Sequence, residues 1–333
     1  MKEALLYVKD EGSVTCGLCA HHCRLTEGKT GICGVRKNIS GVLYSLNYDR
    51  VCAIHADPIE KKPLYHFLPA STSYSIAAMG CNFSCKFCQN SSLSVVPSEA
   101  HIYGDAIAPK ELVRMALEHD AKSIAYTYSE PTIYFELMLE TAKLAKEEGL
   151  LNVMVTNGFM SGEALDMMAP WLDGANIDLK AFTEDFYKKQ CGGRLQPVLD
   201  TIKAMHQHGI WVELTTLLIP GLNSDQKELE ELISFILGVD ANIPWHVSRF
   251  FPQHRLVDVP PTPTGMLYGA LEMGKKMGLK YIYAGNVGGD EFSHTRCPQC
   301  DTVLIKRSGY YTRVSRLADG VCGNCNTPIP GVW

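Results

Sequence analysis

Apolar and polar positions follow two different periods along the middle of the chain. Short, mainly apolar runs, such as those at 73–79, 122–128 and 151–156, predict buried strands. Longer stretches between them, such as 131–149 and 224–238, carry apolar residues at helical spacing and predict amphipathic helices. Strands and helices alternate in this way through most of the chain, which is typical of a parallel sheet.

The number of these units favours a barrel over an open, doubly wound sheet, which is the alternative. About six or seven strand–helix units fit between residues 69 and 290. Polar residues that could bind a ligand or take part in catalysis follow the C-terminal ends of the strands, which is where (β/α) barrels hold their active sites. We therefore expect an α/β fold, with a partial (β/α)6 barrel over 69–290. A Cys-rich module over 1–68 and a zinc-ribbon-like module over 291–333 should flank it.

Composition narrows the class of protein further. The chain has 333 residues, of which 46% are hydrophobic, and this is ample for a large core. Its net charge is −5 and its Lys and Arg residues are scattered, which argues against a nucleic-acid partner. The N-terminal stretch MKEALLYVKDEG lacks the apolar core of a signal peptide, and no apolar run is long enough to span a membrane. We expect a cytoplasmic protein.

Cysteines are the most informative residues. The chain has 13, and in a protein without an export signal they are expected to be reduced thiols or metal ligands. Eleven of them fall into three groups, which metal binding explains. The groups are Cys16, Cys19, Cys23 and Cys33; Cys81, Cys85 and Cys88; and Cys297, Cys300, Cys322 and Cys325.

The middle group has only three cysteines, at 81, 85 and 88, directly after a predicted strand. A structural zinc site normally takes four ligands. Three thiolates suit an iron–sulfur cubane in which one iron stays free of protein and can bind another molecule. A zinc knuckle that borrows a fourth ligand is the alternative.

This loop, C-N-F-S-C-K-F-C, resembles the C-x3-C-x-φ-C signature of the radical SAM superfamily, with Phe87 at the aromatic position φ. The resemblance implies that Cys81, Cys85 and Cys88 hold a [4Fe–4S] cluster and that S-adenosylmethionine binds its free iron. Reductive cleavage of that cofactor would give a 5′-deoxyadenosyl radical, which abstracts hydrogen from a small-molecule or protein substrate. A reductant such as flavodoxin or ferredoxin would supply the electron.

The resemblance extends to the ends of the later strands, where it implies contacts to S-adenosylmethionine. The motif YTYSEP places Glu130 where the superfamily has the carboxylate of a Gly-Gly-Glu motif, although Tyr128 and Ser129 replace the glycines. The motif VTNG places Thr156 and Asn157 at the end of the next strand.

Further along, NIDLK places Asp178 and Lys180 at the D-x-K pair of glycyl-radical activating enzymes. IPWHVSRF aligns His246 with a histidine that contacts the cofactor in the pyruvate formate-lyase activating enzyme. An inward salt bridge for the pair, and a structural role for the histidine, are the alternatives.

More of the chain resembles one family within this superfamily. The Cys-rich N-terminal segment, the stretch DPIEKKPLYHFLP and YTYSEP together resemble the radical SAM protein of the AmmeMemoRadiSam system. That family is related to pyruvate formate-lyase activating enzymes. The resemblance implies Amme-type and Memo-type proteins as partners.

The two outer cysteine groups predict further metal sites. Two C-x2-C pairs, Cys297 with Cys300 and Cys322 with Cys325, have zinc-ribbon spacing and predict structural zinc, with an auxiliary iron–sulfur cluster as the alternative. The N-terminal four suit either zinc or a [4Fe–4S] cluster, and His21 or His22 could replace a thiolate.

Two other functions are compatible with these features. The chain could activate a glycyl-radical enzyme, which requires a groove open to a loop of the partner. From a different class, the metal-stabilised segments could form a protein-docking module without catalysis. A redox carrier is a third possibility, but such a protein would not need Glu130, Asp178 and Lys180 at strand ends.

Overall fold

A nine-stranded sheet forms the centre of the computed structural model, which describes residues 1–288 and 291–333. Seven neighbouring strands run parallel. In sheet order these are β15 (Ile282–Gly285), β14 (Trp245–Arg249), β13 (Trp211–Leu218), β12 (Gly174–Asp178), β11 (Leu151–Thr156), β10 (Ser123–Tyr126) and β8 (Thr72–Ala78). At the β8 edge, β7 (Arg50–Pro58) pairs antiparallel with β8, and β9 (Asp105–Ala106) pairs antiparallel with β7 and completes the sheet.

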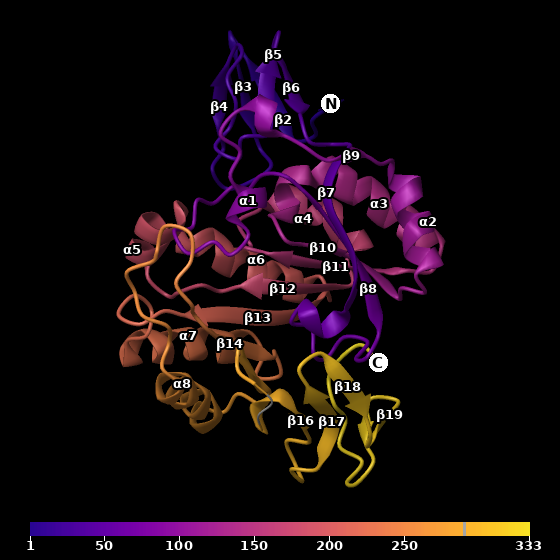
Figure 1. The fold of residues 1–333 in the computed structure, drawn as a ribbon, viewed down its shortest axis with the longest axis vertical. Helices are drawn as coiled ribbons and strands as arrows, with labels where there is room; N and C mark the ends of the chain where they lie inside the picture. The colour runs from indigo at the N-terminus through magenta and orange to yellow at the C-terminus, as the bar shows by residue number, and fades with distance from the viewer. Residues whose placement is uncertain (289–290) are drawn as a thin grey trace.

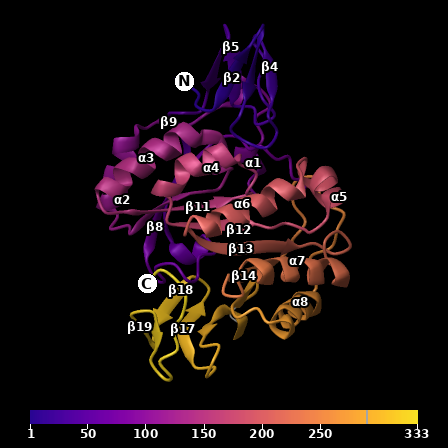
Figure 2. The same ribbon diagram turned by 180° about the vertical axis from the view of Figure 1, so that it is seen from behind.

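Helices cover the outer face of this sheet, as Figure 2 shows from behind. The main ones are α2 (Pro109–Glu118), α3 (Phe135–Glu147), α4 (Gly162–Met168), α6 (Leu195–Gln207), α7 (Gln226–Val239) and α8 (Thr264–Met277). Within the described residues, β15 does not pair with β9, so the barrel stays open. The predicted partial barrel is confirmed, with one parallel strand more than six. The edge strand β7 comes from the stretch expected in the N-terminal module.

Local sequence explains these elements. All four residues of β10 are buried, as expected for a parallel strand covered on both faces. Asp225 caps the N-terminus of helix α7, because its side chain accepts hydrogen bonds from the backbone N–H groups of Lys227 and Glu228. Helix α8 ends at Met277 and is followed by Gly278, whose φ of 111° favours glycine. No helix in the described part of the chain is long and apolar enough to cross a membrane.

Two small modules lie at opposite ends of the molecule (Figure 1). The N-terminal module has two antiparallel sheets, one of β1 (Lys2–Glu3), β6 (Val42–Ser45) and β5 (Arg36–Ile39), the other of β2 (Tyr7–Asp10), β3 (Ser13–Cys16) and β4 (Arg24–Thr26). The C-terminal module has one sheet of β16 (Thr295–Arg296), β17 (Val303–Ser308) and β18 (Tyr311–Val314), and a hairpin of β19 (Leu317–Ala318) and β20 (Val321–Cys322).

Candidate functional site

The three-cysteine loop directly follows β8 and is held by a segment far away in the sequence. A π-helix, η5 (Tyr187–Cys191), lies against it. The backbone N–H of Ser84 donates to the carbonyl of Cys191 at 2.8 Å, and that of Lys86 donates to the carbonyl of Gln190 at 2.9 Å. These two bonds fix the stretch between Cys81 and Cys88. π-Helical turns are rare and occur frequently at functional sites.

Two glycines allow this close approach. Gly193 packs against Phe83 so tightly that a Cβ on it would lie 2.2 Å from Cε1 of the ring. Gly192 has φ of 75° and lies against Ser84. A side chain at either position would push the loop outward. On the other side, Nη2 of Arg255 donates to the carbonyl of Ser84 at 2.6 Å.

Glu130 lies at the centre of a buried hydrogen-bond network. Its Oε1 accepts from the hydroxyl groups of Thr132 and Thr156 at 2.6 and 2.7 Å, and from the backbone N–H of Thr132 at 3.0 Å. Its Oε2 accepts from the backbone N–H of Asn157 at 2.8 Å. Burial raises the pKa of Glu130 above its usual value, although these hydrogen bonds oppose the shift. The network joins the strand ends of β10 and β11.

Asn157 carries this network to the loop. Its Nδ2 donates to Oδ1 of Asn82 at 2.7 Å and lies 3.8 Å from Sγ of Cys81. Its Oδ1 accepts from the backbone N–H of Phe159 at 3.0 Å. Glu130, Thr156, Asn157 and Cys81 are therefore brought together.

Asp178 and Lys180 approach the loop from the end of β12. Nζ of Lys180 lies 2.6 Å from Oδ2 of Asp178 and 6.0 Å from the centre of the Phe87 ring. Burial disfavours the ammonium, but the charges of Asp178 and Cys85 outweigh it, and the pKa of Lys180 rises well above its usual value. A hydrogen bond with Cys191 lowers the pKa of Cys85. The pair is thus a salt bridge beside the loop.

Tyr128 explains how the chain departs from a Gly-Gly-Glu motif. Its φ is 65°, a conformation that glycine adopts readily and tyrosine seldom does. The phenol donates to Asp57, and Nζ of Lys62 lies 4.6 Å over the ring. Lys62 also pairs with Asp57 at 2.6 Å. The stretch DPIEKK therefore holds the unusual backbone in place.

His246 belongs to a different group of side chains. It is buried, and its Nε2 lies 2.6 Å from Oε2 of Glu213. Glu213 also accepts from the backbone N–H groups of Tyr65 and His66 at 3.0 and 2.7 Å. This network ties the segment after β7 to β13 and β14, and it does not include the cysteine loop.

The four C-terminal cysteines form a compact metal site. Their sulfur atoms all lie within 4.8 Å of one another. The Sγ atoms of Cys297 and Cys325 are 3.5 Å apart, and those of Cys300 and Cys322 are 3.7 Å apart. Four sulfurs about 2.3 Å from one tetrahedral ion would be about 3.8 Å from each other, so the set matches a single ion. The metal-binding module predicted at the C-terminus is therefore present.

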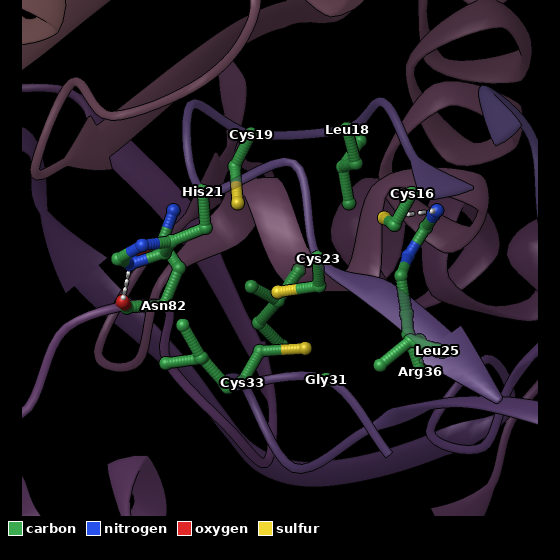
Figure 3. Close-up of a pocket in the computed structure, with 12 residues that line it drawn as sticks. Cys16, Leu18, Cys19, His21, Cys23, Leu25, Gly31, Cys33, Arg36 and Asn82 are labelled. Carbon is green, nitrogen blue, oxygen red and sulfur yellow. Dashed lines mark hydrogen bonds between the residues drawn. The ribbon is translucent and has the colours of Figure 1, made fainter. Parts of the chain in front are cut away.

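The four N-terminal cysteines line a hollow instead (Figure 3). The hollow also touches His21 and Asn82. His21 is occupied by a contact of its own, because its Nε2 lies 2.7 Å from the carbonyl oxygen of Asn82. His22 has φ of 48° at a turn of the same loop. The hollow thus adjoins the three-cysteine loop.

Sequence reasoning did not single out Asn82, Gly193 or Arg255. Asn82 follows the first loop cysteine, and its role depends on a partner 75 positions away. Arg255 is 171 positions from its acceptor. Gly193 lies in a Gly-Gly pair beside Cys191, and this pair was the one local signal that the backbone approaches another segment closely there.

Comparison with known proteins places the site in a family context. The model of the radical SAM superfamily matches residues 76–236. An uncharacterized protein of Methanocaldococcus jannaschii is 43% identical over 319 residues, which are 95% of each chain. The pyruvate formate-lyase-activating enzyme of Clostridium pasteurianum is 23% identical over 162 residues, 48% of this chain and 67% of that enzyme.

Solved structures support the fold. The structure of Streptococcus suis SuiB bound to S-adenosylmethionine matches with a TM-score of 0.51 at 14% identity, over 68% of this chain and 53% of that one. A radical SAM methyltransferase from Sphaerobacter thermophilus matches with a TM-score of 0.50 at 14% identity, over 66% of this chain and 67% of that one. At such identities the similarity concerns the barrel and not the substrate.

Proposed function

This chain belongs to the radical SAM superfamily, and from that premise we propose that it cleaves S-adenosylmethionine reductively at a [4Fe–4S] cluster held by Cys81, Cys85 and Cys88. We propose further that the cleavage serves to abstract hydrogen from a small-molecule or protein substrate. One observation carries the proposal: three cysteines follow the first parallel strand, and the polar ends of β10, β11 and β12 converge on them.

The residues around the loop fit this cofactor pair. When bound and reduced, the cluster supplies the electron that breaks the C5′–S bond and so generates the hydrogen-abstracting radical. The three thiols share one half-buried loop, and the positive charge of Lys180 acts on Cys85 within it. Among the described residues, Oε2 of Glu130 accepts one hydrogen bond, so it can accept another from the ammonium of S-adenosylmethionine. Phe87 is buried and can exclude water.

The test uses full-length protein reconstituted without oxygen. We expect wild-type protein, given dithionite and S-adenosylmethionine, to release 5′-deoxyadenosine, and its reduced EPR signal to change when S-adenosylmethionine is added. A Cys81/Cys85/Cys88→Ala variant should lose both properties. A Cys52→Ala variant is the control, since Cys52 lies outside the three groups. A wild-type signal that is indifferent to S-adenosylmethionine contradicts the proposal.

Activation of a glycyl-radical enzyme is a second candidate. The similarity to the pyruvate formate-lyase-activating enzyme of Clostridium pasteurianum favours it, and the open barrel edge is compatible with entry of a loop. The experiment adds a glycyl-radical enzyme to the reduced protein and looks by EPR for a new radical on that enzyme. 5′-Deoxyadenosine formation without a protein radical favours a small-molecule substrate instead.

For the compact C-terminal site we propose structural zinc. The sulfur separations of 3.5 and 3.7 Å support one tetrahedral ion. Hydrogen bonds, first of all with Thr302, lower the pKa of Cys300 to about 5, which favours the thiolate form that binds zinc. The core of this module is small and is shared with Tyr281 and Tyr283 of the barrel, so a metal would stabilise its fold.

A further inference from the structure

We propose that Cys16, Cys19, Cys23 and Cys33 hold a second iron–sulfur cluster, of the [4Fe–4S] type, in which every iron is bound by protein. The four residues come from β3 and from the loops after β3 and β4. They line one hollow that is partly open to solvent (Figure 3). This proposal concerns a site separate from the three-cysteine loop and does not depend on the proposed activity.

The spacing of the sulfurs favours a cluster over a single zinc ion. In the described parts of the chain, the C-terminal cysteines are the one set of three or more candidate ligands within 4.8 Å of one another. The N-terminal sulfurs are therefore spread more widely than four sulfurs about 3.8 Å apart around one zinc. A cubane needs this wider spread, because each thiolate binds a different iron. The cysteines of the 81–88 loop are also too widely spread to form such a compact set.

The walls of the hollow also suit a cluster. Apolar side chains line it, namely Leu18, Leu25, Ile32 and Ile133. Gly31 leaves room between two ligands, since a Cβ there would lie 3.7 Å from Sγ of Cys23 and 3.8 Å from Sγ of Cys33. A bulky residue at that position would project into the space between the two thiols.

Arg36 gives an independent indication of a negatively charged group. It lines the hollow, its side chain is 1% exposed, and its Nη1 lies 3.9 Å from Sγ of Cys16. Glu136 and the carbonyl of Leu5 accept from its other N–H groups. Its Nε has no acceptor among the described residues. A buried donor without a partner is costly, and cluster sulfur would supply the missing acceptor.

The residues proposed to hold the second cluster lie next to the three-cysteine loop. Asn82 lines the hollow, and its neighbour Cys81 belongs to the three-cysteine loop. Gly80 makes the contact possible: its φ is 115°, and a Cβ on it would lie 3.0 Å from the carbonyl oxygen of Cys33. The two cysteine loops therefore pack against each other, and Asn82 of the 81–88 loop forms part of the wall of the hollow.

The decisive experiment uses the Cys81/Cys85/Cys88→Ala variant of the full chain, reconstituted anaerobically with iron and sulfide. We expect about four irons and four sulfides per chain to remain, with a reduced EPR signal that does not change with S-adenosylmethionine, because four thiolates leave no iron free. Adding Cys23→Ala and Cys33→Ala should remove this iron, whereas adding Cys52→Ala should not.

The proposal is overturned if the four N-terminal cysteines of the triple variant hold zinc instead of iron. It is also overturned if circular dichroism shows that the triple variant is folded and metal is bound only at the C-terminal site. The first measurement uses the Cys81/Cys85/Cys88→Ala variant, whose N-terminal module is unchanged, so the test does not depend on whether a variant of that module folds. They also do not require activity. A failure of the proposed function would appear in the wild type, as an EPR signal that S-adenosylmethionine does not change.

Discussion

Nδ2 of Asn157 donates a hydrogen bond to Oδ1 of Asn82 across 2.7 Å and joins the end of β11 to the three-cysteine loop. The same Nδ2 lies 3.8 Å from Sγ of Cys81. Because Asn157 also donates its backbone N–H to Glu130, one residue connects the loop with the carboxylate proposed to bind S-adenosylmethionine. Changes at Asn157 should therefore alter the loop and the cofactor site together.

Asn157→Ala should lower both stability and turnover. It removes the donor of the buried Oδ1 of Asn82, and an unsatisfied buried acceptor costs about 1–3 kcal/mol. We expect a lower melting temperature and slower formation of 5′-deoxyadenosine. Asn152→Ala is the matched control, since Asn152 is equally buried at the other end of β11 and donates to the carbonyl of Ala142. We expect turnover to fall more in Asn157→Ala than in Asn152→Ala. The prediction fails if the two variants have the same turnover.

Gly193→Ala should impair assembly of the loop. The added Cβ would lie 2.2 Å from Cε1 of Phe83, so the ring must move, and such overpacking costs about 1–3 kcal/mol. We expect less iron at the loop and a lower melting temperature. Gly269→Ala is the control, because Gly269 lies in α8 with nothing within 4 Å, and alanine there should stabilise the helix by about 1 kcal/mol. Unchanged iron content in Gly193→Ala would refute the argument.

The repeating part of the fold was predictable because it depends on local patterns. Strand β11 was expected over 151–156 and extends from Leu151 to Thr156, since its apolar run is bounded by polar turns. Strand β7 was not expected as part of the sheet. It is half exposed, and its pairing with β8 depends on a bulge near Val51 that no local pattern reveals.

The candidate site divides in the same way. Cysteine spacing predicted the candidate ligands at Cys81, Cys85 and Cys88, because thiolates on one short loop must lie near each other. The sequence spacing alone could not distinguish a zinc ion from a cluster at the site of Cys16 and Cys33, since either can be bound by four thiolates. The distances between the sulfur atoms depend on the tertiary structure. The place of His246 was equally hidden, because its partner Glu213 is on a neighbouring strand.

Lys180→Met should reduce turnover without loss of iron. The raised pKa keeps Lys180 charged. Replacement by methionine removes its charge-assisted contact to Asp178, which contributes about 1.5–3 kcal/mol. When this contact positions the bound cofactor, its loss lowers turnover roughly tenfold to hundredfold. The assay is 5′-deoxyadenosine formation against S-adenosylmethionine concentration, with iron measured in the same samples. Lys227→Met, at an exposed lysine, should behave as wild type. Equal turnover in the two variants would assign Lys180 to structure alone.

Cys322→Ser should release the C-terminal metal. Cys322 is fully buried among the four ligands, and serine is a poor ligand for zinc. We expect zinc to fall from about one ion per chain to almost none, and limited proteolysis to cut within 291–333. Cys52→Ser should keep the zinc. Loss of iron rather than zinc in Cys322→Ser would identify an auxiliary cluster there instead.

Stability should fall as the pH decreases from about 6.5 to 4, and His66 should account for part of this change. Burial lowers the pKa of His66 to about 4. The neutral ring fits its contacts, because Nδ1 lies 2.8 Å from the carbonyl of Pro330 and Nε2 lies 2.6 Å from the hydroxyl of Tyr283. In this pH range the unfolded chain binds a proton that the folded chain does not. The expected loss is about 3 kcal/mol.

The measurement is guanidinium unfolding of wild type and His66→Gln at several pH values. Acid also releases thiolate-bound metal, but this affects both proteins, so the difference between their free energies isolates the histidine. The variant should be less stable than wild type at pH 7 and lose less stability on acidification. His101→Gln, at an exposed histidine, should follow the wild type throughout. If His66→Gln and wild type keep a constant difference between pH 7 and 4, then His66 is protonated in the folded protein as readily as in the unfolded chain.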